Sequence, residues 1–271
     1  MKLAWFTNGD RNRASSRLRA WGIAYRLPFE SAFNDEAAAE SADVVLVQKR
    51  PDLHEKMKSW ATSKPVVWDC GDEIGYTPPE GVIVITPGHY FGPGIVLPGL
   101  VDVSESPQVK TSHGVLRRVC WYGDPLNQRH VYPVVVACER MKLECVLITD
   151  VERAEFTGCT YRQWSIDTVD AEIQACDLVA CPFVDAPRKG ENKLLKAWAL
   201  GMPVVGTPVE SYRSFGLRWK ATTAEEWVDT LTLMRCPERS AADADLGRAT
   251  VLWHQRRIIP AWESFLRGLA Q

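Results

Sequence analysis

The stretch Lys189–Tyr212, KGENKLLKAWALGMPVVGTPVESY, predicts a loop, a short helix, a buried strand and a turn, in that order. Gly201 is expected to end the helix, because glycine readily adopts the left-handed conformation that closes many helices. Met202–Gly206 follows as an apolar run of strand length, and the Gly-Thr-Pro sequence after it supplies the turn. This order of elements is typical of one αβ unit in a doubly wound sheet.

The start of this helix is the first candidate binding site. Asn192 and Lys193 lie there, where backbone N–H groups lack partners and the positive end of the helix dipole favours an anion. Such a unit can hold a diphosphate on its backbone amides, with Lys193 beside it. The alternative is an ordinary αβ unit in which Lys193 is an exposed, solvated cation.

Apolar strands alternate with amphipathic helices along the whole chain, which predicts an α/β protein with mainly parallel sheets. The expected strands are residues 2–7, 43–48, 65–69 and 82–86 in the first half, and 118–122, 144–149, 178–182 and 202–206 in the second. Residues 87–107 separate the halves and carry four prolines and four glycines, which is typical of a linker. An apolar stripe at Ile258, Trp262 and Leu266 predicts a C-terminal helix.

The composition limits the class of protein. The chain has 271 residues, of which 46% are hydrophobic, enough for two modest domains with real cores. A net charge of −2 excludes a general basic field for nucleic acid. The eight cysteines form no CxxC pair, which favours a reduced, cytoplasmic protein over a disulfide framework or a zinc site. No signal peptide is visible and no apolar run approaches the roughly 20 residues that span a bilayer, so no membrane insertion is expected.

The quoted stretch resembles the donor-binding core of GT-B glycosyltransferases, in particular the large retaining group that uses nucleotide-diphosphate sugars. The usual wording there is close to NKLLEAMALGxPVVATPV. Residues 95–102, IVLPGLVD, resemble the linker of the same group. The resemblance implies two Rossmann-like doubly wound domains that face a cleft. Residues 1–100 would be the acceptor domain, 101–252 the nucleotide-sugar donor domain, and 253–271 a helix that packs back on the first domain.

The resemblance also implies an activity. The protein would move a hexosyl group from a nucleotide-diphosphate sugar to an acceptor hydroxyl, with retention, without a tightly bound cofactor and without a metal requirement. Lys193 and Arg129 are the candidates for the diphosphate, each against the alternative of a solvated surface cation. The full set of candidate donor-binding residues is Arg129, Arg188, Lys189, Glu191, Asn192, Lys193, Gly206, Thr207 and Pro208.

One departure from the family pattern concerns the ribose. The group carries a glutamate where this chain has Lys196, and a second acidic residue where it has Arg188, so the E-x7-E pattern is absent. Glu191 lies nearby as a possible substitute. The resemblance implies that glutamate at position 196 would improve donor binding. The departure leaves open a degenerate GT-B protein that acts as a non-catalytic binding or scaffold module; a sugar-nucleotide epimerase on the same frame is a third reading.

The first half offers candidate acceptor-binding residues. Ser15 or Ser16 is expected to cap a helix whose apolar face carries Leu18, Trp21 and Tyr25. Ser15, Ser16 and Arg17 follow a glycine-containing loop, and the resemblance places that loop near the substrates. The run Arg11, Arg13, Arg17 and Arg19 is the strongest local positive patch, with a solvated helix face as the alternative. Such a patch suits a polymer acceptor such as DNA with hydroxymethylated bases.

Acidic residues follow the strand at residues 65–69. Asp69 is a candidate for substrate binding and Asp72 for catalysis, because carboxylates at a strand's carboxyl end can position or activate a hydroxyl. The alternative for Asp69 is capping of a turn. His89 is the second candidate catalytic residue, although a lone histidine is more often structural.

Overall fold

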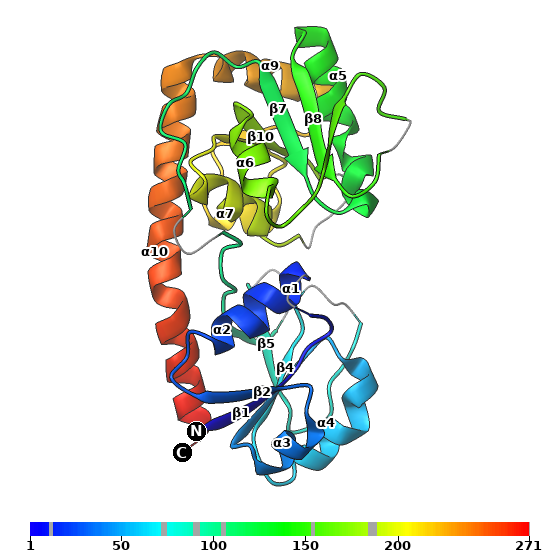
Figure 1. The fold of residues 1–271 in the computed structure, drawn as a ribbon, viewed down its shortest axis with the longest axis vertical. Helices are drawn as coiled ribbons and strands as arrows, with labels where there is room; N and C mark the ends of the chain where they lie inside the picture. The colour runs from blue at the N-terminus through cyan, green and yellow to red at the C-terminus, as the bar shows by residue number, and fades with distance from the viewer. Residues whose placement is uncertain are drawn as a thin grey trace. The chain divides into compact units, whose positions relative to one another are not determined.

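The computed structural model describes the chain except residues 11–12, 72–74, 89–92, 104–106, 153–154, 184–188 and 271. The predicted site residues Asp72, His89 and Arg188 therefore lie outside the described residues. The chain divides into two compact units (Figure 1). Unit 1 comprises Met1–Leu100 with Trp253–Gln271, and unit 2 comprises Val101–Leu252.

Unit 1 contains a six-stranded parallel sheet in the order β2-β1-β3-β4-β5-β6. Its strands are β1 (Lys2–Phe6), β2 (Glu30–Phe33), β3 (Val44–Gln48), β4 (Val66–Asp69), β5 (Ile83–Thr86) and β6 (Ile95–Val96). The four predicted strands of this half are present. The sequence reading missed the two edge strands, because β2 is short and only half-buried, and β6 lies in the stretch that was predicted to be a linker.

Helices cover both faces of this sheet. One face packs against α1 (Ala14–Ser16), a π-helix η1 (Arg17–Trp21), α2 (Gly22–Ala24) and the end of α10 (Pro237–Leu269). In α10 the predicted stripe Ile258, Trp262 and Leu266 is fully buried in this unit, and Trp262 Nε1 donates to the Pro98 carbonyl at 2.9 Å. The other face packs against α3 (Glu36–Ser41), η2 (Pro51–Leu53) and α4 (His54–Trp60).

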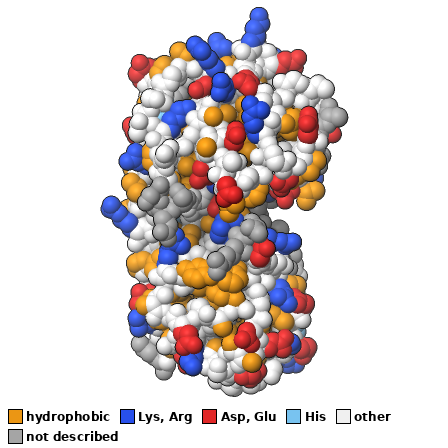
Figure 2. Space-filling view, viewed as in Figure 1, with side chains coloured by type: hydrophobic (Ala, Val, Ile, Leu, Met, Phe, Trp, Pro, Cys, Tyr) orange, Lys and Arg blue, Asp and Glu red, His pale blue; other side chains and the backbone are white. Residues whose placement is uncertain are grey.

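The first helical segment differs from the prediction. It begins at Ala14 after Arg13, which makes no side-chain cap, so neither Ser15 nor Ser16 caps it. The wider π-helical turn changes which residues face the core. Tyr25, expected on the buried face, is 59% exposed, whereas Ala20 is fully buried. Exposed apolar side chains gather over this part of unit 1 (Figure 2).

Unit 2 contains a second six-stranded parallel sheet, in the order β12-β11-β10-β7-β8-β9. Its strands are β7 (Arg118–Tyr122), β8 (Glu144–Thr149), β9 (Thr160–Gln163), β10 (Leu178–Cys181), β11 (Val204–Gly206) and β12 (Trp219–Lys220). Its helices are η4 (Pro125–Val131), α5 (Tyr132–Met141), α6 (Val169–Gln174), α7 (Asn192–Ala199), α8 (Glu210–Ser214) and α9 (Ala224–Met234). Thr223 and Glu226 form a capping box at the start of α9.

The strand orders locate a topological switch point in each sheet. In unit 2 the chain runs outward from β7 to β9 and then returns to β10 on the other side of β7. In unit 1 it runs from β1 to β2 and returns to β3 on the other side of β1. Ligands of open α/β sheets bind outside the carboxyl ends of the strands at such points. The ends of β7 and β10, and of β1 and β3, are therefore where binding residues are expected.

Candidate functional site

At the switch point of unit 2, the start of α7 lies beside the end of β7. The Tyr122 hydroxyl, on the last residue of β7, donates to the Lys193 carbonyl at 2.7 Å. This bond fixes the first turn of α7 against the strand. Lys193 thereby extends toward the loop that follows β7.

The Lys193 ammonium is buried and has no hydrogen-bond partner among the described residues. Its Nζ lies over three aromatic rings, 4.3 Å from the centroid of Trp121, 5.7 Å from Tyr122 and 5.8 Å from Phe183. Gly123, with φ of +151°, allows this path, because a Cβ there would overlap Lys193 Nζ. The alternative of an exposed, solvated lysine is therefore wrong for the charged group.

Burial lowers the pKa of Lys193 to about 8, because desolvation disfavours the charged form. Cys181 and Asp124 favour the ammonium, and the neighbouring Lys189 disfavours it. A buried ammonium without an acceptor is costly, and cation–π contacts offset only part of that cost. The geometry therefore favours an anion that would accept hydrogen bonds from Lys193.

A second ammonium lies beside the same ring. Lys189 Nζ donates to Asn127 Oδ1 at 2.9 Å and lies 5.3 Å from the centroid of Phe183. Lys189 and Lys193 thus flank Phe183, which follows the end of β10. Two like charges over one ring repel each other, and a ligand with two negative charges would relieve that repulsion.

The residues around α7 differ in exposure. Asn192, the first residue of α7, is exposed, and Glu191 before it is only 3% exposed. Arg129 is exposed on η4, between the buried Gln128 and His130. Glu191 and the Lys193 ammonium are thus buried, whereas Asn192 and Arg129 are exposed.

In the turn after β11, the polar groups of Thr207 already have hydrogen-bond partners within the protein. The Thr207 N–H donates to the Cys181 carbonyl at 3.1 Å, so this amide is already paired. The Thr207 hydroxyl accepts from the Phe183 N–H at 3.0 Å and lies 3.2 Å from the Ala221 carbonyl, to which it donates. Gly206 lies in β11 and Pro208 is half-buried. Thr207 therefore holds the Phe183 backbone in place.

Lys196, the residue that departs from the family pattern, is 7% exposed. Its ammonium lies 2.6 Å from Asp170 Oδ1 and 3.9 Å from Asp102 Oδ2. The buried Lys196 is therefore paired with two half-buried aspartates, of which Asp102 is the aspartate of the IVLPGLVD segment. Sequence spacing alone gave no indication of these partners.

At the carboxyl end of the unit 1 sheet, Asp69 is buried and paired. Its Oδ2 accepts from Arg19 Nε at 2.7 Å, and its Oδ1 accepts from the Gly71 N–H at 3.1 Å. Asp69 thus caps a turn, the alternative that the sequence left open, and it also anchors a buried ion pair. Arg19 is only 6% exposed, so it does not contribute to a surface patch of arginines.

The helical segment that carries Ser15, Ser16 and Arg17 contacts the same edge of the sheet through Ser15. Ser15 is half-buried, and its carbonyl accepts from Gln48 Nε2 at 2.9 Å. Ser16 is fully buried, and Arg17 is half-buried. Gln48, at the end of β3, was not predicted from sequence; its place as the last residue of a buried strand was the available signal.

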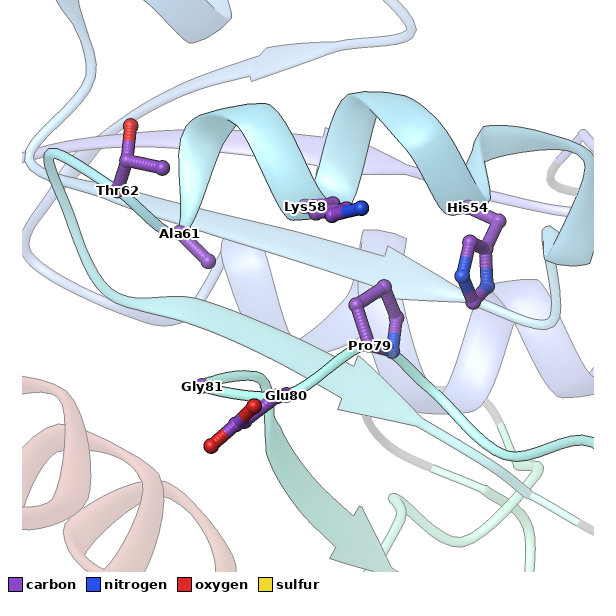
Figure 3. A pocket seen from close by; sticks show the side chains of 7 residues that line it. All are labelled: His54, Lys58, Ala61, Thr62, Pro79, Glu80 and Gly81. Atoms are coloured by element: carbon purple, nitrogen blue, oxygen red, sulfur yellow. The ribbon is translucent and has the colours of Figure 1, made fainter.

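Two surface grooves lie away from these residues. A groove of about 460 Å³ lies between α4 and the turn at residues 79–81, with His54, Lys58 and Pro79 along it (Figure 3). Another, of about 510 Å³, is lined by residues 115–118, 142–144 and Arg235. Neither includes a residue of α7 or its neighbouring loops.

The described part of the chain contains no group of three or more His, Cys, Asp and Glu side chains that could hold a metal ion. Within the same residues, no helix is long and apolar enough to cross a membrane. All eight cysteines are described, and each is a free thiol.

No protein-family model matches the chain, and no curated protein matches it. Solved structures do. Alr3699/HepE of Anabaena in complex with UDP is similar with a TM-score of 0.72 and 12% identity, over 99% of this chain and 100% of that one. The DNA-modifying enzyme β-glucosyltransferase, studied with and without uridine diphosphoglucose, has a TM-score of 0.61 and 8% identity over 100% of both chains. A glycosyltransferase from Rickettsia africae ESF-5 has a TM-score of 0.69 and 9% identity, over 100% of this chain and 98% of that one. The predicted α/β architecture is confirmed: the chain has the GT-B fold.

Proposed function

We propose that the protein is a glycosyltransferase that binds a nucleotide-diphosphate sugar of the UDP type in unit 2. The observation that carries this proposal is the buried, unpaired Lys193 ammonium beside the switch point of the sheet. Lys189 provides a second positive charge over the same ring of Phe183. Support also comes from the fold, since HepE was solved with UDP and the β-glucosyltransferase with uridine diphosphoglucose.

The proposed reaction uses these charges on the leaving group. The bond between the anomeric carbon and the diphosphate oxygen breaks, and its electron pair stays on the diphosphate. Lys193 and Lys189 stabilise the charge that develops there, and such preorganised electrostatic stabilisation is usually a large catalytic term. With retention, the acceptor oxygen bonds to the anomeric carbon on the face that the leaving group departs, and a leaving-group oxygen takes the acceptor proton.

The acceptor is a hydroxyl group. Hydroxymethylated DNA is a candidate acceptor, because one structure of the same fold belongs to a DNA-modifying enzyme. Such a substrate would have to be flipped out of the duplex, at a cost of a few kcal/mol. The net charge of −2 does not favour a large contact with DNA phosphates.

The test is calorimetric titration of the full chain with UDP, UDP-glucose and uridine. We expect UDP to bind more tightly than uridine, because only UDP carries the diphosphate. Lys193→Met should weaken UDP binding about tenfold to a hundredfold, the range for one charge-assisted hydrogen bond. Lys58→Met, on an exposed helical lysine of unit 1, is the control and should leave UDP binding unchanged.

A protein that binds none of these nucleotides would refute the proposal and favour the non-catalytic scaffold. If UDP binds, transfer is followed by mass spectrometry with UDP-glucose and candidate acceptors. Release of an epimerised donor without transfer would favour the epimerase reading.

A further inference from the structure

Three cysteine thiols meet on one face of the unit 2 sheet. Cys145 lies in β8, Cys159 directly precedes β9, and Cys138 lies in α5, which packs against this face. All three side chains belong to the same hydrophobic cluster. The Cys145 thiol is hydrogen-bonded to the thiols of both Cys138 and Cys159. Segments that are distant in the sequence thus bring three oxidisable groups into contact.

The strand register sets the distance between Cys145 and Cys159. β8 and β9 are parallel neighbours, and Leu147 is paired with Tyr161. Two residues earlier on each strand, the same face carries Cys145 opposite Cys159, and both pairs pack in one core cluster. Neighbouring strands lie about 4.8 Å apart. Disulfides join Cα atoms that are about 4.4–6.8 Å apart. The two cysteines therefore lie at a spacing that a disulfide can bridge.

The two thiols differ in their access to solvent. Cys145 is 4% exposed, whereas Cys159 is half-buried at the edge of the sheet, next to a turn at residues 155–158. The hydrogen bond with Cys145 lowers the pKa of Cys159, although burial opposes this effect. Thiolates rather than thiols react with oxidants, and access to solvent decides which cysteine meets them. Cys159 is therefore the cysteine that reacts first, with Cys145 behind it as its partner.

We propose that Cys159 and Cys145 form a reversible oxidation site, at which a hydroperoxide converts the two thiols into one disulfide. The Cys159 thiolate attacks one oxygen of hydrogen peroxide, the O–O bond breaks, and hydroxide leaves, so that Cys159 becomes a sulfenic acid. The Cys145 sulfur then attacks the Cys159 sulfur. The S–O bond breaks, and the oxygen leaves as water with the Cys145 proton. The peroxide gains two electrons and the two sulfurs lose them; a dithiol reductant returns them by thiol–disulfide exchange.

The proposed bond has a structural consequence. It closes a ring of residues 145–159 and ties β9, an edge strand, to β8. Such a ring restricts the unfolded chain, which stabilises the folded state when the native geometry accommodates the bond. The oxidised protein should therefore unfold at a Tm several degrees above that of the reduced protein. Transient, redox-sensing disulfides are the usual kind in a reducing compartment, which the cysteine content predicts for this chain.

The chain carries a second pair of thiols that lacks an exposed member. Cys120 in β7 is hydrogen-bonded to Cys176, and the two side chains are 0% and 2% exposed. If proximity alone decided oxidation, both pairs would form disulfides. If access decides it, only the pair that contains Cys159 reacts. The Cys120–Cys176 pair therefore serves as an internal control.

The test is treatment of the reduced full chain with a small excess of hydrogen peroxide, followed by tryptic peptide mapping without reductant. Trypsin separates the three cysteines of the cluster into residues 130–140, 143–153 and 154–162. We expect a disulfide between residues 143–153 and 154–162, and its loss after treatment with dithiothreitol. Cys120 and Cys176 should remain free thiols. The intact chain should have the mass of a single copy less two hydrogen atoms.

Two variants assign the roles of the two sulfurs. Cys145→Ala should stop at the sulfenic acid, so that dimedone labels Cys159, and Cys159→Ser should lose the reaction altogether. Cys176→Ala removes a buried cysteine outside the cluster and is the matched control; it should form the Cys145–Cys159 disulfide as fast as the wild type does. The peptide map of the wild type requires no substitution, so it decides the question even if a variant does not fold.

Four outcomes would overturn the inference. They are a wild type that keeps its thiols under peroxide, a disulfide that involves Cys138 or the Cys120–Cys176 pair instead, a disulfide between two copies of the chain, and an oxidised protein with a lower Tm than the reduced one. None of these measurements depends on nucleotide binding. UDP titration therefore tests the proposed function separately, and either proposal can fail without the other.

Discussion

Replacement of Lys193 by methionine should make the free protein more stable while it weakens nucleotide binding. The pKa of Lys193 is lowered from 10.5 to about 8 by burial. At about 1.4 kcal/mol for each pKa unit, the charged side chain costs the folded state about 3 kcal/mol. Methionine has a similar length and no charge, so it avoids this cost. Ring contacts of the ammonium are lost, which reduces the expected gain at pH 7 to about 1–3 kcal/mol.

The pH dependence follows from proton linkage. Between pH 8 and 10.5 the unfolded chain holds a proton on this lysine and the folded chain does not, so wild-type stability rises with pH in that window. The penalty is fully present below pH 8 and absent above 10.5. The advantage of Lys193→Met should therefore be largest at pH 7 and should vanish near pH 10.5.

The assay is urea unfolding of wild type and variant at pH 7, 9 and 10.5, together with UDP titration at pH 7. Opposite signs, a gain in unfolding free energy and a loss of affinity, distinguish a binding lysine from a structural one. The reasoning is refuted if Lys193→Met is less stable than wild type at pH 7, or if its stability difference does not change with pH.

Three further predictions concern the same unit. Gly123→Ala should lower the UDP affinity about tenfold and lower the Tm, because the added Cβ overlaps Lys193 Nζ; unchanged affinity by calorimetry would contradict this. Lys196→Glu should destabilise the protein by about 3–5 kcal/mol, because the new carboxylate would face Asp170 and Asp102. A higher UDP affinity with an unchanged Tm would instead support the expectation from the family pattern. The UDP affinity of the wild type should fall from pH 7 to pH 10, as the free lysine loses its proton near pH 8; a flat profile in calorimetry would exclude Lys193 as the pH-sensitive contact.

The local pattern of residues determined the elements near the site. Apolar runs and glycine positions predicted β11 and the preceding helix α7, because backbone hydrogen bonding within an element depends on residues a few positions apart. The same reasoning missed β2 and β12, since short edge strands carry little periodicity. It also misjudged the face of the first helix, where a π-helical turn departs from the regular period.

The electrostatic state of the candidate sites was decided only by the tertiary structure. Arg19 pairs with Asp69 across 50 residues of sequence, and the Tyr122 hydroxyl reaches the Lys193 carbonyl across 71. Lysine in a sequence predicts a solvated cation by default. Whether its ammonium stays in water depends on rings and carboxylates that distant segments bring to it. Sequence thus determined which charged residues lie near the ends of the strands. Packing determined their electrostatic state: the Lys193 ammonium is buried without an acceptor among the described residues, whereas Lys196 and Arg19 each pair with an aspartate.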